Sequence, residues 1–198
     1  MAAGGACLAG LAFPRIVRAA ALGEAVEIGM RSDAEGATVW FDPIGLFVEP
    51  GATIRWVVHE NVHTTAAYHP ANDHHSLRIP ETAQPWNSDY LVNPGDHFAV
   101  TLTVPGVYDY YCLPHEAAGM VGRIIVGEPG GPGARPFDWF KDLPEAKDWL
   151  PVPEAAQAAF PSIEAIMRDR VVRVAGPASK EGGSADPHAG PAGPPPPR

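Results

Sequence analysis

Hydrophobic residues recur at every second position in several short runs between residues 24 and 127. The run over residues 52–59 places Ile54, Trp56 and Val58 on one side, with Thr53 and Arg55 on the other. The run over residues 97–105 repeats the pattern with Phe98, Val100, Leu102 and Val104. An alternation with period two is typical of β-strands that bury one face. The pattern therefore predicts strands whose apolar sides form a common core.

Seven runs of this kind are rich in Val, Ile, Thr and aromatic residues, and Gly and Pro turns separate most of them. Short strands bounded by turn residues predict two packed sheets, because each strand needs a second layer to cover its apolar face. The fold class is thus all-β, a β-sandwich. The seven predicted strands cover residues 24–30, 37–41, 45–50, 52–59, 97–105, 107–112 and 122–127.

A long polar stretch interrupts the strand pattern over residues 67–96 and contains four prolines. It has no sustained period, and loops of this length in a compact domain are uncommon unless they are functional or mobile. Trp86, Tyr90 and Leu91 within it predict that parts of the stretch pack against the sandwich. We expect a long inserted loop at this position.

The two ends of the chain differ in composition from this β domain, which we assign to residues 22–128. Residues 1–21 contain a short apolar core followed by small residues, as in a signal peptide or other targeting segment. Residues 129–175 read as a linker, an aromatic wrap and a short amphipathic helix, and residues 176–198 as a disordered Gly/Pro-rich tail. The predicted helix carries Ile163, Ile166, Met167, Val171 and Val174 at helical spacing.

Charge and cysteine content narrow the function classes. The 198 residues carry a formal net charge of -9 without a Lys or Arg cluster, which argues against nucleic acid and favours basic protein partners. Of the two cysteines, Cys7 falls in the targeting segment, so a mature chain keeps only Cys112. No segment after Ala21 is long enough to span a bilayer. We expect a soluble, exported protein in the periplasm or outside the cell.

Three soft metal donors, Cys112, His115 and Met120, lie within nine positions at the end of a predicted strand. A thiolate, an imidazole and a thioether together favour copper, because zinc sites gain nothing from a methionine. A blue-copper site consists of one Cys, two His and a weak axial Met. A second histidine must therefore come from a distant strand.

Residues 105–126, with Cys112, His115 and Met120 in a Cys-x-x-His-x-x-x-x-Met spacing, resemble the last hairpin of the cupredoxin family in its plastocyanin and pseudoazurin branch. Residues 41–63 resemble the strand pair that leads to the first copper histidine of that family. The resemblance implies that His63, rather than His59, completes the ligand set of one type 1 copper that alternates between Cu(I) and Cu(II). It also implies a Greek-key β-sandwich of the cupredoxin type, with a long inserted loop and a C-terminal helical extension.

Thr64 departs from the resembled pattern, in which an Asn follows the first histidine and braces the cysteine loop. A threonine hydroxyl can still bond a backbone group or the sulfur, with a different reach. Of the other histidines, His69, His74 and His75 in the inserted loop are candidates for a second metal site, although we expect them to be solvated. We also expect Glu116 to be an exposed rim residue, and His97 to lie at the surface.

The resemblance implies a carrier that shuttles single electrons between redox partners such as a cytochrome, an oxidase or a reductase. We expect the protein to be a monomer. The electron is expected to leave through His115, which small apolar residues surround. An alternative is copper homeostasis or tolerance, with the loop histidines as additional ligands. Catalysis of the multicopper type is not expected, because the chain has no His-x-His pair. The apolar patch would comprise Leu113, Pro114, Ala117 and Ala118.

Overall fold

The computed structural model describes residues 24–174. The segments that we assign to a targeting peptide and to a disordered tail lie outside these residues, as do Cys7 and His188. Among the residues that the structure describes, no helix is long and apolar enough to cross a bilayer.

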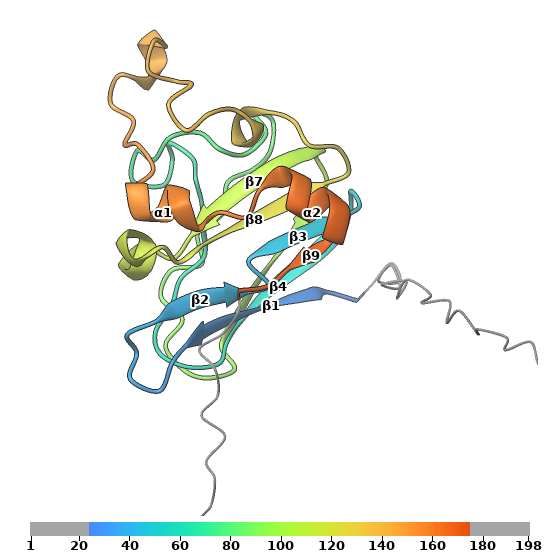
Figure 1. The fold of residues 1–198 in the computed structure, drawn as a ribbon, viewed down its shortest axis with the longest axis vertical. Coiled ribbons are helices and arrows are strands. Elements are labelled where there is room, and N and C mark those ends of the chain that lie inside the picture. Colours follow the sequence, from blue (N-terminus) through green and yellow to red (C-terminus); the bar gives the residue numbers. More distant parts are fainter. Residues whose placement is uncertain (1–23, 175–198) are drawn as a thin grey trace, which may run out of the picture.

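Two sheets stack face to face, as the alternating pattern predicts (Figure 1). β1 pairs in parallel with β4, and β3 pairs in parallel with β8, so both sheets are mixed. All seven predicted strands are present, and the all-β sandwich is confirmed. In spatial order, the first sheet contains β2 (Val39–Asp42), β1 (Val26–Ser32), β4 (Ala52–Val58) and β6 (His97–Leu102). The second contains β5 (Ala66–Ala67), β7 (Gly106–Tyr111), β8 (Val121–Val126), β3 (Gly45–Val48) and β9 (Val171–Val172).

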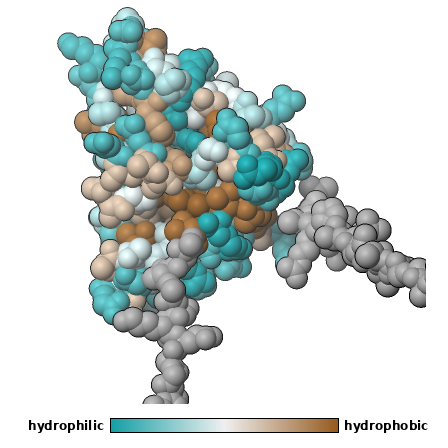
Figure 2. All heavy atoms as spheres, viewed as in Figure 1, coloured by the Kyte–Doolittle hydropathy of each residue, from teal (hydrophilic) through white to brown (hydrophobic). Residues whose placement is uncertain are grey.

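The main core fills the space between the sheets. Ile54, Trp56 and Val58 of β4 are at most 1% exposed, and Phe98 and Val100 of β6 pack against the same core. In the view of Figure 2, hydrophobic atoms gather in a band across the middle of the molecule, between more hydrophilic surfaces above and below. The alternation of the sequence therefore identified the buried side of both strands.

The inserted stretch returns to the sheet rather than extending into solvent. Its second half forms isolated bridges to the segment that leads into β5 and to β5 itself, between Leu91 and His63 and between Asn87 and Ala66. Trp86 is 5% exposed and belongs to the main core, as predicted. The expectation for Tyr90 was wrong, because its side chain is 57% exposed. The alternation at a bridged strand turns Leu91 inward and its neighbour outward.

The C-terminal extension contains two α-helices where the sequence predicted one. α1 (Glu154–Ala159) precedes α2 (Ile163–Asp169), which lies against β3, β8 and β9 (Figure 1). The predicted continuation of α2 through Val171 and Val174 was wrong. Arg170 adopts a positive φ of 64°, which ends the helix, and Val171 then pairs with Leu46 of β3. Short 3-10 helices form at Leu113–Ala118 (η1), Pro132–Ala134 (η2) and Pro144–Ala146 (η3).

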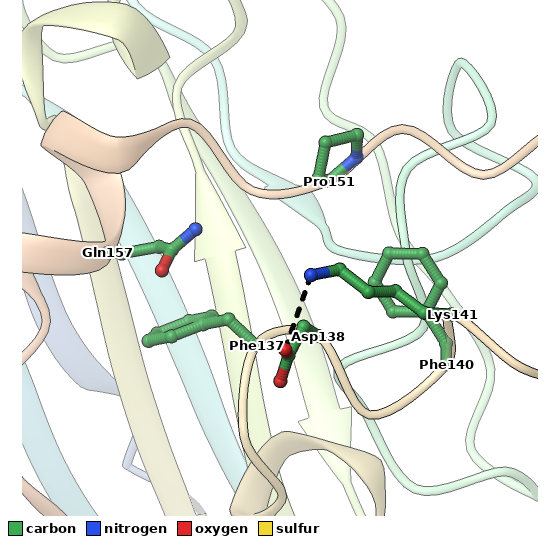
Figure 3. Close-up of a pocket in the computed structure, with 6 residues that line it drawn as sticks. All are labelled: Phe137, Asp138, Phe140, Lys141, Pro151 and Gln157. Carbon is green, nitrogen blue, oxygen red and sulfur yellow. Dashed lines mark hydrogen bonds and ion pairs between the residues drawn. The ribbon is translucent and has the colours of Figure 1, made fainter.

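A surface pocket of about 380 Å³ lies within the C-terminal wrap (Figure 3). Its polar contact is an exposed ion pair between Lys141 and Asp138 at 3.2 Å. None of the candidate copper ligands lines it. The lining residues are Phe137, Asp138, Phe140, Lys141, Pro151 and Gln157.

A buried charged group holds the C-terminal extension on the second sheet. Asp109 of β7 is fully buried, and it accepts hydrogen bonds from Arg78 of the inserted stretch and Arg123 of β8, each at 2.7 Å. Arg78 also donates to the carbonyls of Gly133 and Arg135, and Arg123 donates to that of Pro161. One carboxylate thus connects the inserted stretch, the sheet and the extension.

Replacing Asp109 by Ala is expected to destabilise the fold by about 3–5 kcal/mol, because it leaves two buried guanidinium groups without their anion. Urea unfolding followed by tryptophan fluorescence measures the change. Asp138→Ala is the matched control, because its partner Lys141 is exposed and such pairs contribute about 0–1 kcal/mol. Equal losses of unfolding free energy in the two variants would contradict the role assigned to Asp109.

Candidate metal centre

Three of the predicted donors meet at one point of the structure. The sulfur of Cys112 lies 3.7 Å from Nδ1 of His63 and 3.4 Å from Nδ1 of His115. One donor atom from each of the three residues lies within 4.8 Å of the others, and this is the single such group of His, Cys, Asp and Glu among the described residues. Both imidazoles therefore turn the same ring nitrogen toward the sulfur.

Each donor is placed by a different part of the backbone. His63 follows β4, and its N–H and C=O groups pair with Leu91 of the inserted stretch. Cys112 directly follows β7, and η1 carries His115. The loop then closes on itself, because the N–H of Cys112 donates to the carbonyl of Met120 at 3.0 Å and the N–H of Met120 to that of His115 at 3.1 Å. Gly119 ends η1 with a φ of 83°, a conformation that favours glycine.

Thr64 connects the two halves of the site. Its N–H donates to the sulfur of Cys112 at 3.3 Å, and its hydroxyl oxygen accepts from the N–H of Leu113 at 2.7 Å. The threonine that replaces the expected asparagine thus still braces the cysteine loop, through a shorter side chain. The next residue continues the support, because Thr65 accepts from the indole N–H of Trp86.

Burial governs the protonation of the three donors in the copper-free protein. It raises the pKa of Cys112 to about 11, although the hydrogen bonds from Thr64 oppose this change. It lowers the pKa of His63 to about 4, with a further contribution from nearby His115. Burial also lowers the pKa of His115. Neutral imidazoles are the form that binds a metal, whereas the thiol must lose its proton on binding.

The chemistry of the donors fits copper. A sulfur and two imidazole nitrogens form a soft set, and His63 and Cys112 are both fully buried. Met120 is also fully buried and is joined to Cys112 by a main-chain hydrogen bond. The Nε2 atom of His63 is buried without a hydrogen-bond partner in the described part of the chain.

The remaining histidines stay apart from this group. His59 faces Glu27 at 3.8 Å, and His97 is exposed at the start of β6, as expected. His74 is exposed, whereas His75 is buried and its side chain is 7% exposed. The structure therefore does not gather His69, His74 and His75 into a second donor group within the described residues.

The expectations for His75 and Glu116 were wrong, because the two side chains meet in a buried pair. Nε2 of His75 lies 3.1 Å from Glu116, whose second carboxylate oxygen accepts from the hydroxyl of Tyr68 at 2.7 Å. Burial lowers the pKa of His75, but the hydrogen bonds to Glu116 and to the carbonyl of Asn72 outweigh it, so the pKa is raised overall. No sequence signal indicated a pair 41 positions apart.

Comparison with known proteins gives consistent matches. Residues 28–127 match the family model described as copper binding proteins of the plastocyanin/azurin family. A chloroplastic plastocyanin of Oryza sativa subsp. indica is 33% identical over 132 residues, which cover 63% of this chain and 76% of the rice protein. A chloroplastic plastocyanin of Hordeum vulgare is 38% identical over 101 residues, 47% of this chain and 58% of the barley protein.

Among solved structures, a pseudoazurin from Sinorhizobium is 29% identical, with a TM-score of 0.47. The match covers 68% of this chain and 89% of the pseudoazurin.

Thr64→Val is expected to lower the free energy of unfolding of the copper-free protein by about 1–3 kcal/mol, because the N–H of Leu113 loses its acceptor. Thr64→Ser keeps the hydroxyl and should remain close to the parent. Urea titration of the three proteins measures the effect. A Thr64→Val protein as stable as the parent would contradict the role assigned to the hydroxyl group.

The copper-free protein should lose stability as the pH falls from 6.5 to about 4. The unfolded chain takes up a proton on His63 near its ordinary pKa of 6.5, whereas the folded chain does so only near 4. Within this window the unfolded state binds more protons, so stability rises with pH and this contribution is fully present above 6.5. Unfolding midpoints across the window, in the parent and in His63→Gln, measure it. If the stability of the two proteins changed equally with pH, the contribution assigned to His63 would be refuted.

Proposed function

The chain belongs to the plastocyanin/azurin family of copper-binding proteins, and from this premise we propose that it is a blue copper protein that carries single electrons between redox partners. We assign His63, Cys112, His115 and Met120 as the ligands of one type 1 copper. When bound, the copper supplies the change between Cu(I) and Cu(II). The observation that carries the proposal is the fully buried sulfur of Cys112 with the Nδ1 atoms of two imidazoles at 3.4 and 3.7 Å.

The surroundings of the ligands suit fast electron transfer, because they restrain movement of the donors. His63 is tied to Leu91 by two main-chain hydrogen bonds, and Cys112 is tied to Met120 and Thr64. A donor set that is held by the fold changes little between oxidation states, so little energy is needed for reorganisation. Hydrogen bonds to the sulfur also tune the reduction potential of such a site.

His115 offers the route for the electron to the surface. It is half-buried, whereas His63 is fully buried, so its ring is the more accessible of the two imidazoles. The residues beside it on η1 are small or apolar and exposed, and Leu113 is 38% exposed. A small apolar surface of this kind suits the short-lived complexes of redox proteins. The exposed residues are Leu113, Pro114, Ala117 and Ala118.

We further propose a basic redox protein, such as a cytochrome, an oxidase or a reductase, as the partner. The formal net charge of -9 supports this choice, because opposite charges accelerate encounter. The apolar stretch and small residues within residues 1–21 support export to the periplasm or the cell exterior. We propose that the protein acts as a monomer and not as an enzyme.

Copper-loaded protein is expected to show an intense visible sulfur-to-copper absorption band and a narrow hyperfine splitting in its EPR spectrum. Cys112→Ser should lose the visible band, because the oxygen of serine cannot provide the sulfur-to-copper transition. Optical and EPR spectra of both proteins are the measurement. A colourless copper-loaded parent would overturn the proposal.

Copper titration distinguishes this function from copper storage or tolerance. The carrier binds one tight equivalent that produces the blue colour. Additional tight equivalents that disappear in a His69→Ala, His74→Ala variant would favour copper handling instead. These two histidines are suitable for removal because neither belongs to the buried pair of His75 with Glu116.

A further inference from the structure

The 3-10 turn η1, which carries His115, has an anchor on its outer side that the ligand set does not require. Glu116 follows His115, and its side chain is only 13% exposed. One carboxylate oxygen accepts from the hydroxyl of Tyr68 at 2.7 Å, and the other lies 3.1 Å from Nε2 of His75. The side chain of Glu116 therefore turns inward from the exposed turn η1, and each of its two carboxylate oxygens has a partner.

Both partners of Glu116 belong to the inserted stretch and are themselves fixed. Tyr68 is fully buried, and its N–H donates to the carbonyl of Asp109 on β7. Nδ1 of His75 donates to the carbonyl of Asn72 at 2.8 Å, and its ring stacks on Tyr111 with 4.3 Å between the ring centroids. Because neither partner moves freely, the carboxylate is held against a rigid support.

The C-terminal extension closes the same side of the turn. Helix α1 lies beside η1 (Figure 1), where a Cβ on Gly119 would be 3.3 Å from the Cβ of Ala159. A small hydrophobic cluster behind the turn joins α1 and the inserted stretch to the ends of β7 and β8. Its buried members are Ala66, Tyr68, Tyr111, Val121, Val152 and Ala156.

We propose that Glu116 is a positioning residue for His115: through Tyr68 and His75 it ties the ligand-bearing turn to the inserted stretch and so fixes the imidazole. The inference rests on the proposed function, in which His115 binds copper and passes the electron. Thr64 holds the inner end of the turn at Leu113, and Glu116 holds its middle. The inserted stretch therefore has a function in the copper site, although it contributes no ligand.

The decisive variant is Tyr68→Phe, which removes one hydroxyl and keeps the ring in place. Loss of a direct hydrogen-bond partner of a metal ligand typically costs about 10- to 100-fold in metal affinity or activity. Tyr68 reaches His115 only through Glu116, so we expect the lower end of this range, a fall in copper affinity of about tenfold. The hyperfine splitting of the Cu(II) EPR signal should change as well. In the copper-free protein, the amide hydrogens of His115 and Gly119 should exchange faster with solvent.

Tyr108→Phe is the matched control. Tyr108 is also a buried tyrosine, and its hydroxyl donates to the carbonyl of Val104, outside the turn. It should lose stability without any change in copper affinity, EPR signal or exchange at η1. Glu116→Leu should reproduce the effect of Tyr68→Phe, whereas Glu116→Gln should restore much of the parent behaviour, because the amide keeps an acceptor for Tyr68 and a donor for His75.

Two results would overturn the proposal. One is a Tyr68→Phe protein that matches Tyr108→Phe in copper affinity, EPR signal and amide exchange. The other is a Glu116→Leu protein that behaves as the parent does. A parent that binds copper without the blue band would refute the proposed function instead, and amide exchange in the copper-free variants would still decide whether Glu116 holds the turn.

Discussion

The rest of the structure depends on one constraint, the approach of His63 to Cys112. Nδ1 of His63 and the sulfur of Cys112 lie 3.7 Å apart, although the two residues are 49 positions apart in the sequence. Two loops must meet at the end of the sandwich, namely the one that follows β4 and the one that contains η1. Thr64 supplies the connection, because its amide reaches the sulfur and its hydroxyl reaches the following residue of the other loop. In the core beneath, Trp56 of β4 packs against Tyr110 of β7 with 5.3 Å between the ring centroids, and these are the two strands that lead into the loops.

Two segments outside the sandwich, the inserted stretch and the C-terminal extension, support the place where the two loops meet. The inserted stretch pairs with His63 through Leu91 and contacts the turn of His115 through Tyr68 and His75. The C-terminal extension packs α1 against the same turn. The two arginines that share the buried carboxylate of Asp109 bind both additions to the sheet. A buried carboxylate with two guanidinium partners is tolerated only with complete hydrogen bonding, so this group ties the additions to one arrangement.

The two imidazoles of the site differ in their exposure to solvent. His63 is buried beneath the inserted stretch, and its pKa is lowered to about 4, whereas His115 is half-buried among exposed small residues. A metal bound here would be shielded from water on one side and close to the surface on the other. This asymmetry is suited to an electron carrier, because it limits solvent reorganisation while keeping one ligand within reach of a partner.

The sequence by itself determined seven of the strands, the buried face of β4 and the donor types, because period-two alternation and the Cys-x-x-His-x-x-x-x-Met spacing are local properties. The choice of His63 came from family resemblance. Only the tertiary structure decided that Glu116 turns inward, that Thr64 spans two loops, and that Val171 joins a sheet instead of a helix. Each of these depends on partners that lie between 41 and 125 positions away in the sequence, such as His75 for Glu116 and Leu46 for Val171. A local pattern contains no information about which distant group will be in reach.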